Sequence, residues 1–165
     1  MDDFWRSEKG LIEDFDRGRI PLMTFLRKME EYRSSMEADP TLGTAVVASF
    51  SGHTEGRDLM SILLESCGFR TIRCDRNLPI EKITEICREE KATVLCLSVQ
   101  TTWDLENIRR ADRMLKDMGI REDIVLNAGG GAVSKNVSDA YGCDVFAETA
   151  VSACRAIREA VIGKK

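Results

Sequence analysis

The feature that most constrains this chain is a repeated alternation of short apolar runs and helical patterns, which begins at residue 44. The apolar runs are rich in β-branched and small residues, as in buried strands, and the segments between them repeat apolar residues at helical spacing. Strands are expected at about 44–50, 70–74, 93–98, 123–127 and 143–146. Five strand-helix units joined by short links predict an α/β fold with a parallel sheet.

The number of units favours a flavodoxin-like, or Rossmann-like, five-stranded sheet of order 2-1-3-4-5. In such a sheet the order reverses between the first and third strands, and ligands bind beyond the carboxyl ends of the strands near that point. A length of 165 residues suits one domain with a short extra segment. We therefore expect one domain over 41–165 and a short helical extension over 1–40.

The extension shows two short helical patterns, separated by Gly18 and Pro21. Two short helices bury little surface by themselves, so they must pack on the main domain, on a second copy or on a partner. If they are exposed, Phe4, Trp5 and Phe25 are the residues expected to mediate a homodimer. Packing within the chain is the alternative.

Composition excludes several functions. The net charge of −4 gives no basic surface for nucleic acid, and no apolar run approaches the roughly 20 residues of a membrane span. The acidic start, 1–4, does not resemble a signal peptide. None of the six cysteines forms a CxxC pair, so we expect buried thiols in a reducing cytoplasm and no zinc site.

Unusual residues follow the first, third and fourth expected strands. Residues 51–56 include His53, the only histidine; residues 98–104 are rich in hydroxyls; and residues 127–131 include three glycines. Taken singly, these are an ordinary loop histidine, a helix cap with hydroxyl turns, and a tight turn. The glycines fit neither a P-loop nor a GxGxxG motif. Because all three loops face one crevice, they together predict a large ligand.

The three loops resemble the cobalamin-binding domain of corrinoid proteins, which occurs in methyltransferase systems and in cobalamin-dependent methionine synthase. The family pattern is Asp-x-His-x-x-Gly, then Ser-x-Leu with a Thr two residues later, then Gly-Gly. The chain has Ser-Gly-His-Thr-Glu-Gly at 51–56, Ser-Val-Gln-Thr-Thr at 98–102 and Gly-Gly at 129–130. The segments 132–134 and 141–150 also resemble the methyltransferase branch. The resemblance spans about 44 to 162.

This resemblance implies a cobalamin cofactor, used as methylcobalamin and cob(I)alamin, with His53 as the lower axial cobalt ligand in place of the dimethylbenzimidazole base. The displaced nucleotide tail would enter the crevice, where Ser98 and Thr102 would bond it, Gly129 and Gly130 would leave room for it, and Gly56 would allow close approach near the corrin. A neutral imidazole suits such a metal. The implied cofactor-binding residues are Ser51, Gly52, His53, Thr54, Glu55, Gly56, Ser98, Gln100, Thr102, Asp104, Gly129, Gly130 and Gly131.

The chain departs from the family pattern at two positions. Ser51 replaces the aspartate that normally bonds the far nitrogen of the histidine, and Gln100 replaces a leucine and adds a polar group beside the tail. We hypothesise that Asp104 supplies the missing charge, with Ser51 nearer His53. The alternative is that Asp104 only caps a helix.

An absence also matters, because corrinoid proteins of this branch carry a four-helix bundle over the upper face of the corrin, and residues 1–40 are too short to form one. The upper face of the corrin is then open, covered by a partner, or covered by helices that two subunits share. Trp5 and Trp103 are candidates for contacting the ring, and core packing is the stronger expectation for Trp103.

The resemblance implies a corrinoid methyl carrier, a subunit rather than a complete enzyme, because the cofactor supplies the difficult chemistry. Its partners would be a barrel-type substrate methyltransferase, a methyl-acceptor methyltransferase and a reductive activator. The alternatives are a cobalamin sensor or storage module, the small subunit of an adenosylcobalamin mutase, and a flavodoxin-like domain that has lost its cofactor.

Overall fold

The computed structural model describes residues 4–165, so the first three residues of the acidic start, 1–3, lie outside it. Within the described residues, the chain forms an α/β fold around a parallel sheet of order β2-β1-β3-β4. The strands are β1 (Thr44–Ser49), β2 (Arg70–Arg73), β3 (Val94–Ser98) and β4 (Val125–Gly129). The α-helices are α1 (Lys9–Asp16), α2 (Leu22–Tyr32), α3 (Glu55–Ser66), α4 (Ile80–Glu89), α5 (Glu106–Asp117), α6 (Lys135–Tyr141) and α7 (Ala150–Gly163). Short 3-10 turns are η1 (Arg33–Ser35), η2 (Thr102–Asp104) and η3 (Arg121–Asp123).

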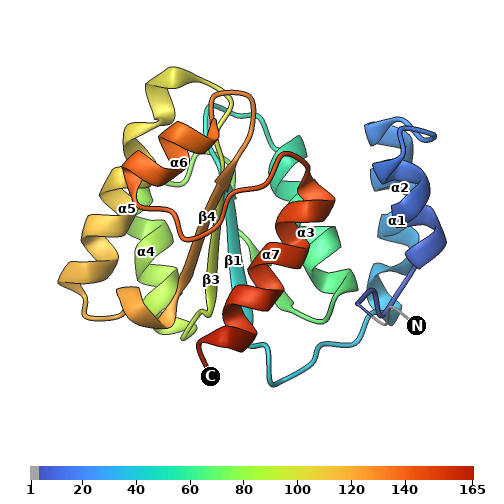
Figure 1. Ribbon diagram of the computed structural model, residues 1–165, viewed down its shortest axis with the longest axis horizontal. Coiled ribbons are helices and arrows are strands. Elements are labelled where there is room, and N and C mark those ends of the chain that lie inside the picture. Colours follow the sequence, from blue (N-terminus) through green and yellow to red (C-terminus); the bar gives the residue numbers. More distant parts are fainter. Residues whose placement is uncertain (1–3) are drawn as a thin grey trace.

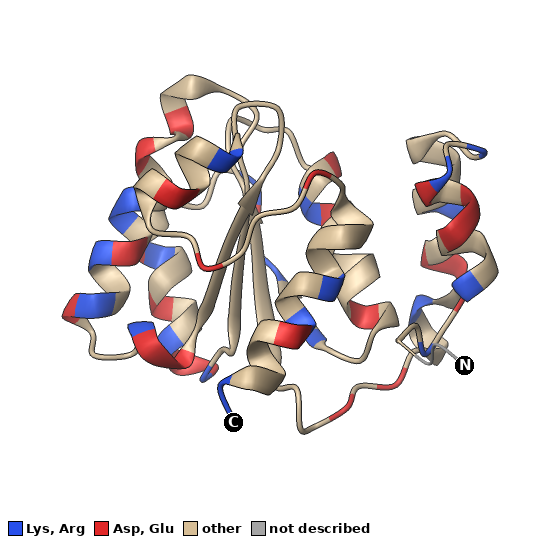
Figure 2. Ribbon diagram, viewed as in Figure 1, with Lys and Arg blue, Asp and Glu red and all other residues tan. Residues whose placement is uncertain are grey.

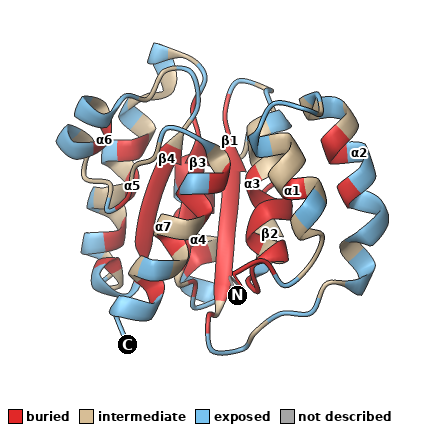
Figure 3. Ribbon diagram, turned by 45° about the vertical axis from the view of Figure 1, so that its right-hand side comes forward, coloured by how far each residue is buried: buried red, intermediate tan, exposed pale blue. Residues whose placement is uncertain are grey.

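Helices cover both faces of the sheet, with α3 and α7 on one face and α4 and α5 on the other (Figure 1). Strand residues alternate between the faces, so Cys96 and Val125 join one core cluster while Leu95 and Leu126 join the other. Charged residues lie on the helices, the loops and the edge strand β2, and are absent from β1, β3 and β4 (Figure 2). These strands are almost wholly buried (Figure 3).

The N-terminal helices α1 and α2 pack against their own chain, beside α3 (Figure 1). Phe25 is fully buried and stacks on Phe15 with a ring-centroid distance of 4.3 Å. Phe4 and Trp5 are also buried in the same core cluster. Because these aromatic residues are covered within the chain, they do not form the exposed homodimer surface that was the other possibility. None of the described helices is both long and apolar enough to span a membrane.

The prediction of a fifth strand at 143–146 is wrong for the described chain. This segment forms a single parallel bridge between Asn127 and Val145. One backbone bond joins the segments, from Asp144 N to Leu126 O at 2.8 Å, and two side-chain bonds accompany it: the Asp144 carboxylate accepts from Leu126 N at 2.8 Å, and Asn127 Nδ2 donates to Val145 O at 3.1 Å. The short apolar pattern placed the segment beside β4 correctly, but the pairing does not continue as a regular ladder.

Strand β4 also begins two residues later than expected, because Asp123 ends the 3-10 turn η3 and β4 starts at Val125. The strand also continues past Asn127 to Gly129, where a loop was expected. Because alternate strand residues share a face, Asn127 lies on the α3/α7 side with Val125 and lines a cavity there.

Candidate functional site

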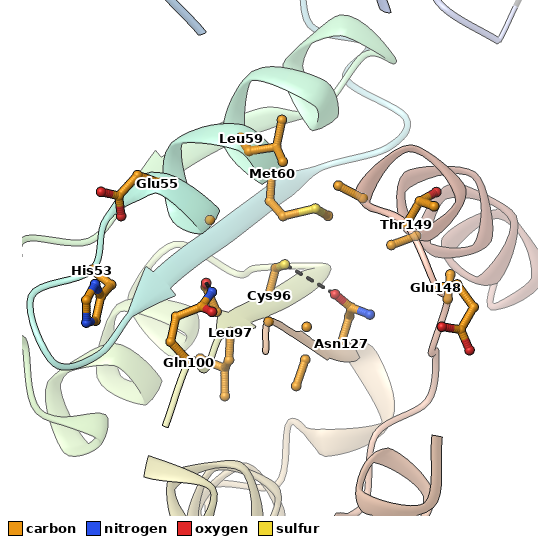
Figure 4. A pocket seen from close by; sticks show the side chains of 18 of the residues that line it. His53, Glu55, Leu59, Met60, Cys96, Leu97, Gln100, Asn127, Glu148 and Thr149 are labelled. Carbon is orange, nitrogen blue, oxygen red and sulfur yellow. Dashed lines mark hydrogen bonds between the residues drawn. The ribbon is translucent and has the colours of Figure 1, made fainter. Parts of the chain in front are cut away.

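The loop that carries His53 joins β1 to α3 at the carboxyl edge of the sheet. Ser51 and Gly52 adopt left-handed backbone conformations, with φ of 60° and 75°, and so reverse the chain abruptly. Gly52 N donates to Asn77 Oδ1 at 2.9 Å, which ties this loop to the one after β2. The His53 side chain is exposed and stands at one end of a cavity (Figure 4). The imidazole has no hydrogen-bond partner among residues 4–165.

A second set of bonds connects the loops that follow β1 and β3. The Ser51 hydroxyl donates to Asp104 Oδ2, and the Thr101 hydroxyl donates to the same oxygen at 3.0 Å. The structure thus brings Ser51 and Asp104 together, as the hypothesis of a relocated charge requires. Asp104 ends η2 and does not cap α5 through its side chain. The loop bearing His53 is therefore anchored to a carboxylate.

The cavity has a volume of about 510 Å³ and lies on the α3/α7 face of the sheet. This volume is within the range of small-molecule sites. Its floor comes from neighbouring strands in register: Cys96 lies opposite Asn127, and Ser98 lies opposite Gly129. Leu59 and Met60 of α3 and Ala153 of α7 form apolar walls. The cavity thus runs inward from the strand ends between two helices.

Glycines shape the entrance in two different ways. A methyl group on Gly56 would overlap the hydroxyl of Ser98, so this glycine lets α3 approach β3 closely. Gly130 has φ of 111°, and a methyl group there would overlap the Val99 carbonyl. At Gly129, in contrast, an added methyl group meets nothing within 4 Å. Gly129 therefore leaves space in the cavity, whereas Gly56 and Gly130 permit close packing of the chain.

The Gln100 side chain lies between His53 and the floor of the cavity (Figure 4). Its Oε1 accepts from Gly131 N at 3.0 Å, and its Nε2 donates to Ser98 Oγ at 3.4 Å. The amide thus spans from the end of β3 to the glycine turn after β4. A group that extends from His53 toward the floor must pass beside this amide.

Sequence reasoning did not select Asn127 or Cys96, which form the deep floor. Asn127 is 2% exposed and Cys96 is 1% exposed, and Cys96 Sγ lies 3.3 Å from Asn127 Oδ1. Burial raises the pKa of the Cys96 thiol to about 12, so the thiol is neutral and can donate this bond. A polar residue in the otherwise apolar run 124–128 was the available signal, but the expected strand ended at that residue.

The structure divides the expected site residues into two groups. Those that line the cavity are His53, Glu55, Gly56, Ser98, Gln100, Gly129 and Gly130. Those outside its lining are Ser51, Gly52, Thr54, Thr102, Asp104 and Gly131. Trp103 is 90% exposed, so the expectation that it packs in the core is wrong, whereas Trp5 lies in the core and away from the cavity. The described residues contain no group of three or more His, Cys, Asp or Glu side chains that could hold a metal ion.

No family model matches the chain. Curated relatives do. Dimethylamine corrinoid protein 1 of Methanosarcina mazei is 30% identical over 162 residues, which cover 91% of this chain and 75% of that protein. The chain belongs to the methylamine corrinoid proteins. Trimethylamine corrinoid protein 1 of Methanosarcina acetivorans is 26% identical and matches 91% of this corrinoid protein and 76% of the relative. This membership confirms the family that the three loop motifs predicted.

Solved structures share the fold of this corrinoid protein. A cobalamin-binding protein from Desulfitobacterium hafniense superposes with a TM-score of 0.72 at 22% identity, over 88% of this chain and 73% of that one. A chain of the methanol:cobalamin methyltransferase complex from Methanosarcina barkeri also gives a TM-score of 0.72, at 24% identity over 93% and 62% of the two chains. These similarities confirm the Rossmann-like arrangement of a parallel sheet between helices.

Proposed function

We propose that this corrinoid protein carries a methyl group on a bound cobalamin, with His53 as the lower axial ligand of cobalt. The observation that supports this most directly is an exposed imidazole at the entrance of a cavity that runs into the sheet. Neither ring nitrogen is engaged by another described residue, so one is available to a metal. The cavity then takes the nucleotide tail that the histidine displaces.

The residues present fit such a tail. Ser98 is buried in the cavity lining, and its hydroxyl proton remains available because the oxygen accepts from Gln100. Gly129 leaves open space beside it. The walls are mostly apolar, as is usual for sites that bury an organic ligand. Thr102, the second hydroxyl expected to bond the tail, is exposed on η2, and its role stays a prediction.

When bound, the cobalt centre of the corrinoid accepts and releases the methyl group, and the chain holds and orients it. The Ser51 hydroxyl donates its hydrogen bond to Asp104, so its oxygen lone pairs can accept an N–H from the far imidazole nitrogen. We propose that Ser51 and Asp104 position His53 in this way. Groups that orient a metal-bound histidine typically contribute tenfold or more to metal affinity.

The test of the axial ligand compares wild type, His53→Ala and the surface variant Lys82→Ala after incubation with hydroxocobalamin and desalting. Wild type and Lys82→Ala are expected to retain the corrinoid with the same visible spectrum, whereas His53→Ala gives a changed spectrum and weaker retention. Absence of retention by wild type would contradict the proposed function.

The test of positioning uses Asp104→Asn with Glu106→Gln as the matched control, since Glu106 is an exposed acid two residues away that bonds only Arg109. We expect Asp104→Asn to lower cobalamin affinity about tenfold and to reduce the histidine-ligated fraction in the spectrum. Equal spectra for the two variants would show that Asp104 serves only to hold the loop.

The named relatives favour a carrier over a sensor or a mutase subunit, because they are corrinoid proteins of methylamine systems. We propose a barrel-type substrate methyltransferase and a methyl-acceptor methyltransferase as partners, with a reductive activator. Incubating the reduced, loaded protein with a methylamine methyltransferase and each methylamine in turn should methylate the cofactor with one of them. Methylation by none would argue against the carrier role.

A further inference from the structure

Asn127 occupies a special place in the cavity that is proposed to hold the tail. Its partner across the sheet is Cys96, two residues before the Ser98–Gly129 pair at the entrance, which places it about 6.6 Å deeper. It is 2% exposed and its side chain points into the cavity (Figure 4). The walls from α3 and α7 are apolar at Leu59, Met60, Ala150 and Ala153, and the polar residues Glu148 and Thr149 line the cavity just before α7.

The Asn127 amide is only half used by the protein. A primary amide has two N–H donors and two acceptor lone pairs. One N–H donates to Val145 O at 3.1 Å, and the oxygen takes one bond from the Cys96 thiol at 3.3 Å. One donor and one acceptor of this buried amide therefore remain. A buried polar group of this kind is stabilised by a ligand that pairs with both atoms.

We infer that Asn127 selects the base of the corrinoid tail and favours an adenine-type purine over dimethylbenzimidazole, an inference that rests on the proposed function. Adenine presents an amino donor beside a ring-nitrogen acceptor, and asparagine pairs with this edge through two bonds. Dimethylbenzimidazole detached from cobalt offers one acceptor nitrogen and two methyl groups, so it leaves the Asn127 carbonyl without its second partner. A site built for two bonds discriminates strongly against a ligand that makes only one.

The position of Gln100 is consistent with this assignment. Its amide also faces the cavity and, like that of Asn127, makes one bond at each end, to Ser98 and to Gly131. Gln100 is exposed, however, so water can pair with its remaining donor and acceptor, whereas those of Asn127 are buried at the end of the route of the tail. The two amides have separate roles, and the selectivity belongs to Asn127.

The experiment measures equilibrium binding of three corrinoids to the full chain: one with adenine as the lower base, cobalamin with dimethylbenzimidazole, and cobinamide, which has no nucleotide tail. Wild type should bind the adenine form about tenfold more tightly than cobalamin. In Asn127→Leu, which keeps a side chain of comparable length without the amide, the ratio should fall to about one. Cobinamide affinity should be the same in both proteins.

Outcomes separate this inference from the proposed function. If wild type binds both tailed corrinoids equally, or prefers cobalamin, the inference is overturned while the proposed function stands. If none of the three corrinoids binds, the proposed function fails and the inference fails with it. Adenosine monophosphate is a further arm, since a free nucleotide that binds as tightly as the adenine corrinoid would overturn the assignment to a corrinoid tail. The wild-type ratio decides the question even if Asn127→Leu does not fold, which thermal unfolding will reveal.

Discussion

Two groups of polar side chains lie beside β4, each around a buried residue, Arg121 in one and Asn127 in the other, and they differ in how fully their hydrogen bonds are satisfied. In the Arg121 cluster (Arg121, Asp112 and Asp144), the guanidinium makes four bonds of 2.7 to 2.9 Å, to both carboxylates and to the carbonyls of Ile124 and Gly142. In the cavity-floor cluster (Cys96, Ser98 and Asn127), donors and acceptors remain available to a ligand. One cluster therefore stabilises the fold, and the other is available for binding.

The difference follows from which groups face each cluster. The Arg121 cluster is closed by the chain itself, because the 142–144 turn folds back on η3 and supplies both a carbonyl and a carboxylate. The cavity floor is covered by α3 and α7, which contribute the apolar side chains of Leu59, Met60, Ala150 and Ala153 to the lining. A buried polar group without a partner lowers stability, so the floor is expected to gain most when a ligand binds.

The largest expected effect on stability is that of Arg121→Met. The Arg121 side chain is 8% exposed, and its removal leaves Asp112 and Asp144 without their shared partner. Breaking a buried ion pair in this way should lower the free energy of unfolding by about 3 kcal/mol, measured by urea denaturation at pH 7. The matched control is Arg110→Met, whose exposed pair with Glu81 should cost at most about 0.5 kcal/mol. Equal losses would refute the distinction between the clusters.

A second effect depends on pH and concerns Asp112. Burial raises the pKa of this carboxyl, but the bonds from Lys116 and Arg121 outweigh it, and the folded pKa is lowered. The stability it contributes is complete above the unfolded pKa of about 3.9 and is lost as pH falls through the lower folded pKa. Asp112→Asn should therefore cost about 2 kcal/mol at pH 7, and the difference from wild type should shrink as pH falls below about 4. A constant difference between pH 7 and pH 2 would contradict this.

A smaller effect distinguishes the two kinds of glycine at the cavity. Gly56→Ala forces a methyl group against Ser98 and should lower the free energy of unfolding by about 1.5 kcal/mol. Gly129→Ala adds the same group to open space and should change stability by at most about 0.5 kcal/mol. Corrinoid retention should nevertheless fall in Gly129→Ala. If Gly129→Ala proves the more destabilising, the space beside Gly129 is not a cavity in solution.

Much of this fold could be predicted, because alternation of strand and helix patterns is a local property of sequence. The order of β2, β1, β3 and β4 followed from the number of units and a general rule. The prediction of a fifth strand failed for a physical reason: a short apolar run does not show whether its backbone will pair regularly with a neighbouring strand. Here the segment makes a single bridge to β4, and the side chains of Asp144 and Asn127 add bonds to Leu126 and Val145.

The candidate site was predictable where it depends on position at the sheet edge. His53, Ser98 and Gly129 end strands or follow them, and the structure places all three in one cavity lining. Asn127 was missed because it was the last residue of the expected strand, and ligand contacts were sought in the loop that follows it; β4 continues to Gly129 and leaves Asn127 inside the strand. The bond between the Gln100 side chain and Gly131 joins two loops that are far apart in sequence, so no local pattern predicts it.

The smallest effect is expected for the thiols, and it tests whether the cavity floor stays closed. Burial raises the pKa of Cys96 to about 12 and that of Cys143, beside the Arg121 cluster, to about 11. Relative to an ordinary thiol, the thiolate of Cys96 at neutral pH is then about three thousandfold rarer. Iodoacetamide at pH 7.5 should label the half-buried Cys143 first and leave Cys96 unlabelled in the native chain, measured by peptide mass spectrometry. In guanidinium, the control, all six cysteines should react. Faster labelling of Cys96 would mean that its bond to Asn127 opens in solution. The Asn127 oxygen would then have two free lone pairs instead of one.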